Sequence, residues 1–156
     1  MDILGARGPP ADPEDRLAIT RRSGDVQLLD ARFVCGRDHL VSAVEHAERA
    51  MREGTNAARS LPVEFLLYAA GERQIADALA KMGIRRDTTE FAVVLFGGDP
   101  ESVLRGLGLT RDDAVLAPSR QKLRAFGLTD AELDSVPEDG QADLVFERVA
   151  MVDLLK

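Results

Sequence analysis

Two stretches of hydrophobic residues at helical spacing dominate the centre of the chain, between residues 56 and 83. The first stripe comprises Val63, Leu66, Leu67 and Ala70, and the second comprises Ile75, Leu79 and Met82. Each stripe places its apolar side chains on one side of a helix. Pro62 suits the first turn of the first helix because its missing N–H costs nothing there, and Gly71 can end that helix. We expect Gly83 to cap the second helix in a left-handed conformation.

Shorter patterns predict the other elements. Apolar runs predict strands at residues 2–6, 26–34, 91–96 and 114–116. We expect 26–34 to be a central strand and 91–96 to be buried on both faces. Capping residues predict helices that begin at Asp12, Asp38, Asp99 and Thr129, and the first two of these helices end at Gly24 and Gly54. The pattern indicates one α/β domain over residues 1–156, with a small mixed or largely antiparallel sheet flanked by several helices.

Residues 144–156 predict an unusually apolar helix. Val145, Val149 and Val152 recur at helical spacing, and further apolar residues occupy much of the remaining circumference. Such a helix is either deeply buried or covered by a partner. We favour the partner, because a terminal helix seldom lies in the centre of a small domain.

Composition and charge narrow the classes of protein. With 45% hydrophobic and 30% charged residues the chain is globular, and one cysteine cannot form an internal disulfide. We expect a cytoplasmic protein, because no signal peptide or apolar run of about 18 residues is present. The net charge of −7 disfavours nucleic-acid binding by bulk attraction. Residues 49–86, however, hold seven basic and four acidic side chains, a local charge of +3.

The start of the second central helix is a candidate anion site. Gly71, Arg73 and Gln74 lie where free N–H groups and the positive end of the helix dipole gather, so they could hold a phosphate. An ordinary surface pair between Arg73 and Asp77, four residues apart, explains Arg73 equally well. Both interpretations remain open on spacing alone.

The other candidate chemical groups favour structural roles. Cys35 has no motif around it and is expected to be inert, and His39 and His46 are seven apart, whereas zinc-binding histidines on a helix are usually four apart. Asp112 and Asp113 lack a nearby nucleophile or metal partner and are expected in a solvated turn. The sequence thus predicts no catalytic activity, metal or cofactor.

Several sequence blocks together resemble a known family. They are GARG, DARFV followed by RDHLVSAVEHA, VEFLLYAAGERQIADAL with MGI, and ERVAMVDLLK. The chain resembles the small kinase-binding subunit of the KEOPS (EKC) complex, the TPRKB family, in its archaeal type. The resemblance covers most of the chain, and residues 97–140 carry no strong family motif.

The resemblance implies a non-catalytic regulatory subunit that acts in threonylcarbamoyladenosine modification of tRNA. Members bind the small atypical kinase/ATPase subunit, and archaeal members also hold the single-stranded 3′ CCA end of tRNA. The implied RNA contacts are Gly71, Arg73, Gln74 and Ile75, with Arg59 nearby. The implied kinase contacts are Val149, Val152 and Leu155. The alternatives are a protein-only regulator of the kinase, which the acidic net charge favours, and an enzyme or small-ligand domain, for which no site emerges.

Overall fold

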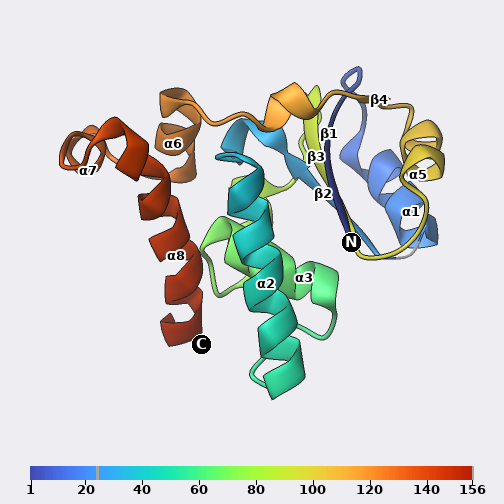
Figure 1. Ribbon diagram of the computed structural model, residues 1–156. Coiled ribbons are helices and arrows are strands. Elements are labelled where there is room, and N and C mark those ends of the chain that lie inside the picture. Colours follow the sequence, from blue (N-terminus) through green and yellow to red (C-terminus); the bar gives the residue numbers. More distant parts are fainter. Residues whose placement is uncertain (24, 156) are drawn as a thin grey trace.

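An antiparallel sheet lies at the centre of the protein (Figure 1). The computed structural model describes residues 1–23 and 25–155. Within these residues the sheet has four strands in the order β2-β3-β1-β4, namely β1 (Asp2–Arg7), β2 (Val26–Asp30), β3 (Glu90–Leu95) and β4 (Thr110–Arg111). Every neighbouring pair of strands is antiparallel. Because β3 lies between β1 and β2, Val93 of β3 is opposite both Leu4 of β1 and Leu28 of β2. The predicted α/β fold with a largely antiparallel sheet is confirmed.

Helices cover both faces of the sheet (Figure 1). One face is covered by α1 (Pro13–Ser23) and α5 (Pro100–Leu107). The other is covered by α2 (Arg37–Glu53) and α3 (Leu61–Ala70). On the same side α4 (Ile75–Met82) packs against α3, α8 (Gln141–Leu155) packs against α2 and α3, and α6 (Arg120–Phe126) and α7 (Asp130–Asp134) precede α8 in the chain. Among the described residues, no helix is long and apolar enough to cross a membrane.

The side chains of β3 alternate between two apolar layers. Phe91 and Val93 belong to the layer beneath α1 and α5, whereas Ala92 and Val94 belong to the layer beneath α2 and α3. Successive side chains of a strand point to opposite faces, so both layers share β3. The prediction that residues 91–96 are buried on both faces is confirmed for the strand, from Phe91 to Leu95.

The prediction of a central strand at residues 26–34 is wrong in two respects. The strand ends at Asp30, whose carboxylate accepts a hydrogen bond from the backbone N–H of Arg32 (3.0 Å) and starts a 3-10 turn, η1 (Ala31–Phe33). The strand also lies at the edge of the sheet, because β3 pairs with both β1 and β2. A run of apolar residues indicates that both faces of a strand are buried. It does not indicate whether the strand has a hydrogen-bonded neighbour on one edge or on both.

The predicted strand at residues 114–116 is instead a 3-10 turn, η2 (Asp113–Leu116). The Asp112 carboxylate accepts from the backbone N–H of Ala114 (3.1 Å), and the Asp113 carboxylate accepts from the N–H of Gly5 in β1 (3.0 Å). Apolar side chains of the turn reach the core without a strand. The two aspartates therefore fasten a partly exposed turn to the sheet.

Most predicted helix ends agree with the structure. Asp99 caps α5, Thr129 begins α7 in a reciprocal capping interaction with Glu132, and Gly54 ends α2 in a left-handed conformation. One start differs, because the N-cap of α2 is Gly36 and not Asp38. The positive φ of 99° at Gly36 suits glycine, which has no Cβ.

Other predicted helix ends differ from the structure or fall on residues that the structure does not describe. Gly83 is extended (φ −65°) and not left-handed; glycine is required because a Cβ would lie 2.5 Å from the carbonyl oxygen of Leu79. The last helix begins at Gln141, before the predicted residue 144, and α6 was not predicted. Gly24, at which the first helix was expected to end, and Lys156 lie outside the described residues.

Candidate functional site

The turn between α3 and α4 is built around Gly71. Its φ of 67° is left-handed, and its backbone N–H donates to the carbonyls of Leu67 and Tyr68 in the last turn of α3. The N–H of Glu72 also donates to Leu67 (3.0 Å). This closing pattern is common at glycine-terminated helices, and it holds the chain at a defined angle as it leaves α3.

Two side chains satisfy the remaining carbonyls at the end of α3. His39 Nε2 donates to Ala69 O (2.7 Å) and Lys81 Nζ donates to Ala70 O (2.7 Å). The ring of Phe126 lies between them, 5.1 Å from the His39 ring centroid and 4.0 Å from Lys81 Nζ. Burial lowers the pKa of Lys81 from its ordinary value, partly offset by Glu72. Unpaired helix-end carbonyls are costly when buried, so these contacts hold the end of α3 against α2 and the last turn of α4.

The start of α4 leaves polar groups available to a ligand. Gln74 is the N-cap of α4, and its side chain makes no capping hydrogen bond. Arg73 is exposed, and its Nη1 donates to the backbone carbonyl of Leu155 in α8 (3.2 Å). No ion pair between Arg73 and Asp77 is present among the described residues, which leaves the surface-pair interpretation without support. The N–H groups of the first turn of α4 and the Arg73 guanidinium form an electropositive edge.

Arg73 and Gln74 line a shallow surface hollow of about 500 Å³. Its other lining residues are Thr55, Asn56, Ala57 and Leu155. The hollow therefore joins the loop after α2, the start of α4 and the last turn of α8, which are far apart in the sequence. Of the other predicted RNA contacts, Ile75 is exposed and follows Gln74 as the first residue of α4. Gly71 is half-buried and Arg59 is exposed, and neither lines the hollow.

The buried carboxylate of Glu64 holds one wall of this hollow. Glu64 is 0% exposed, and its Oε2 accepts from the backbone N–H groups of Ala57 (3.0 Å) and Ala58 (2.7 Å). The Asn56 side chain donates to the Ala58 carbonyl (2.8 Å) and closes the loop further. Sequence reasoning missed Glu64. The available signal was a charged residue in the first turn of a largely apolar helix, where a buried carboxylate needs hydrogen-bond donors.

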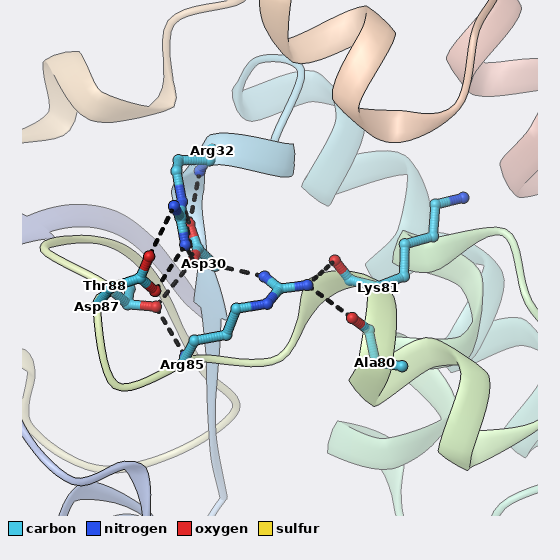
Figure 2. A network of polar contacts seen from close by, with 7 residues as sticks. All are labelled: Asp30, Arg32, Ala80, Lys81, Arg85, Asp87 and Thr88. Atoms are coloured by element: carbon cyan, nitrogen blue, oxygen red, sulfur yellow. Dashed lines mark hydrogen bonds and ion pairs between the residues drawn. The ribbon is translucent and has the colours of Figure 1, made fainter.

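A polar network holds the far end of α4 (Figure 2). Arg85 Nη2 donates to the carbonyl of Ala80 (2.7 Å), while its Nη1 lies 3.6 Å from Oδ2 of the buried Asp30. Asp30 also accepts from Arg32 Nη2 (2.6 Å) and from the hydroxyl of Thr88 (2.8 Å). Burial alone would raise the pKa of Asp30, but hydrogen bonds from Arg32 and Thr88 outweigh it and lower the pKa. The network ties α4 to the end of β2.

Two of the three predicted partner-binding residues are in the core. Val149 and Val152 are each 0% exposed, because α8 packs its valine stripe against α2 and α3. These two assignments are therefore wrong, since neither side chain can reach a partner in this structure. Leu155 is 41% exposed, and Met151 (45%) and Leu154 (82%) are exposed with it in the last turns of α8. These three are the large apolar side chains of α8 that a partner could reach.

The fold and the hollow define a small α/β protein with a polar surface site next to an exposed apolar helix end. Residues 11–137 match the family model described as kinase binding protein CGI-121, and the chain belongs to this family. The family predicted from the sequence blocks is confirmed.

Two relatives carry names from the same complex. The chain is 27% identical to the KEOPS complex subunit Cgi121 of Pyrococcus abyssi over 139 residues, which cover 88% of this chain and 69% of the relative. It is 30% identical to the EKC/KEOPS complex subunit CGI121 of Yarrowia lipolytica over 73 residues, which cover 47% of this chain and 43% of the relative. The match thus spans less than half of the yeast relative.

Proposed function

We propose that this chain is the kinase-binding subunit of a KEOPS complex and holds the single-stranded 3′ end of tRNA for threonylcarbamoyladenosine modification. In this role the chain is non-catalytic, acts in the cytoplasm, and recruits tRNA to a catalytic partner. Membership of the kinase-binding family supports the first part of the proposal, as do the names of both relatives.

The RNA-binding part is carried by one observation, the hollow at the uncapped start of α4. A phosphate there can accept hydrogen bonds from the first N–H groups of α4 and from Arg73. Ile75 (45% exposed) and Leu79 (48%) offer apolar surface for unstacked bases on the same helix.

Three exposed apolar side chains support the protein-binding part. Met151, Leu154 and Leu155 lie within five residues at the end of α8, where large apolar groups are costly unless a partner covers them. Leu154 is 82% exposed and is the natural anchor of such a contact. A second candidate function, a protein-only regulator of the kinase, is favoured by the net charge of −7, which repels RNA as a whole.

Filter binding with intact tRNA and with tRNA lacking its terminal CCA tests the RNA proposal. We expect the intact tRNA to be retained more strongly. Arg73→Glu should weaken its binding about tenfold or more, because a charge-assisted hydrogen bond to phosphate becomes a repulsion. The matched control is Arg105→Glu in α5, an exposed charge reversal on the opposite face of the sheet. Equal retention of both RNAs, or equal losses in the two variants, would contradict the 3′-end site.

Co-purification with the small kinase subunit tests the partner contact. Leu154→Glu should abolish co-purification while thermal unfolding of the isolated chain stays within a few degrees of wild type, since an exposed change costs about 0.5 kcal/mol or less. The matched control, Leu79→Glu in α4, makes the same change at an exposed leucine and should retain the kinase. Retention of the kinase by Leu154→Glu would place the contact elsewhere. Val152→Glu should unfold the chain outright, because it buries an unpaired charge.

A further inference from the structure

We infer that Asp153 is the positioning residue that holds the last turn of α8 in place, and with it both the wall of the hollow and the exposed apolar side chains. No motif in the sequence points to this residue. For its consequence on RNA binding the inference rests on the proposed function, whereas its structural part can be tested without RNA.

The Asp153 carboxylate is held by side chains from two other helices. The hydroxyl of Tyr68 in α3 donates to its Oδ1. His46 Nδ1 in α2 lies 3.1 Å from its Oδ2, and Arg49 Nη2, one turn further along α2, lies 3.6 Å from the same oxygen. The His46 ring stacks on the Tyr68 ring, with centroids 5.4 Å apart. Burial raises the pKa of Tyr68, as does its bond to Asp153, so this hydroxyl stays protonated and keeps donating at neutral pH.

An aspartate at this position opposes the helix dipole. The last turn of α8 carries free backbone carbonyls and the negative end of the dipole, where an acidic side chain is unfavourable. The contacts of the Asp153 carboxylate with Arg49 and Tyr68 offset that unfavourable interaction. They also connect the last turn of α8 to α2 and α3. Beyond Val152 the described side chains of α8 are all exposed, with Leu155 still 41% exposed, so little apolar packing holds the final residues. The carboxylate is thus the anchor that keeps this turn from fraying.

The anchored turn reaches the hollow through its backbone. Leu155 follows Asp153 by two residues, lines the hollow, and accepts the hydrogen bond from Arg73 through its carbonyl. If the turn frays, Arg73 loses its acceptor and the hollow loses a wall. The outward side chains of the same turn include Leu154, so a protein bound to them would hold the turn even without the anchor. Partner binding and RNA binding are then coupled through one helical turn.

Hydrogen–deuterium exchange of the full chain tests the anchor without any ligand. Asp153→Asn keeps the shape of the side chain and removes its charge; the control, Asp143→Asn, makes the same change at an exposed position in the first turn of α8. In Asp153→Asn we expect exchange of the last turn of α8 to quicken about fivefold or more, with the core of α2 and α3 unchanged. Equal exchange in the two variants would overturn the inference.

Titration with a tRNA minihelix ending in CCA tests the consequence. For the isolated chain, Asp153→Asn should weaken binding by about threefold to tenfold, and saturating kinase subunit should restore wild-type affinity, because the partner removes the cost of ordering the turn. An equal loss with and without the kinase would overturn the coupling. If the wild type binds no RNA, the proposed RNA function fails, and the exchange experiment still decides the role of Asp153.

Discussion

The buried imidazole of His39 makes the stability of this protein depend on pH in a way that can be calculated. The ring is 0% exposed; its Nδ1 accepts from the backbone N–H of Cys35 (3.1 Å) and its Nε2 donates to Ala69 O. The bond from Cys35 requires the neutral ring, since a protonated ring has no acceptor. Burial lowers the pKa of His39 to about 4. The hydrogen bond to Ala69 O acts in the opposite direction and raises the pKa, whereas the nearby charge of Lys81 makes a smaller lowering contribution.

The sign and size of the effect follow from linkage. The pKa is about 6.5 in the unfolded chain and about 4 in the folded protein, so the unfolded chain binds the proton more tightly. The stabilising contribution is present above the unfolded pKa and is lost as the pH falls from about 6.5 towards 4. At pH 5 the loss is about 2 kcal/mol. That is a large part of a typical stability of about 5–15 kcal/mol.

Urea unfolding followed by circular dichroism at pH 7 and pH 5 measures this loss. In the variant His39→Gln, the amide can still donate to Ala69 O and does not titrate. The variant should have a lower free energy of unfolding than wild type at pH 7. Between pH 7 and pH 5, however, the variant should lose about 2 kcal/mol less of its free energy of unfolding than wild type loses. Carboxylates titrate in both proteins and cancel in the comparison. The same pH-dependent loss in both proteins would refute the assignment of a neutral, buried His39.

Two other variants probe one wall of the hollow and the network at the far end of α4. Glu64→Gln should destabilise the fold by about 1.5–3 kcal/mol, because the charge-assisted bonds to Ala57 and Ala58 are lost; chemical denaturation measures this, and an unchanged midpoint would contradict a supporting role for the carboxylate. Arg85→Lys should cost about 1–2 kcal/mol in the same assay, since an ammonium group cannot span Asp30 and the carbonyl of Ala80 as the guanidinium does. Stability equal to wild type would show that the Figure 2 network does not hold α4.

Local interactions made much of the helical structure predictable. The stripes of α3 and α4, the cap at Asp99 and the pairing of Thr129 with Glu132 each involve residues within a few positions of one another. The left-handed Gly71 follows from the same local chemistry. By contrast, α6 contributes only Leu123 and Phe126 to the core, too few apolar positions for a periodic signal.

The candidate site was predictable only in part. Arg73 and Gln74 could be named because the start of a helix is a local feature, and the structure places both in one hollow. The supporting role of Glu64 was signalled only by a charge in an apolar helix, and no motif marked Asp153. The groups that contact these two carboxylates lie 6 to 107 residues away along the chain, and only the packed structure brings them within reach.

The valine stripe of α8 shows where sequence information ends. A helix that is apolar on most of its surface has the same pattern whether its own chain or a partner covers it, because burial free energy depends on the area removed from water and not on what removes it. By itself, the sequence of this protein determined most of the helices, several of their caps and the family. Only the tertiary structure decided the strand order, which face of α8 is core, and that the loop after α2, the start of α4 and the end of α8 meet at one hollow. Those outcomes depend on contacts between residues distant in the chain, for which no local pattern exists.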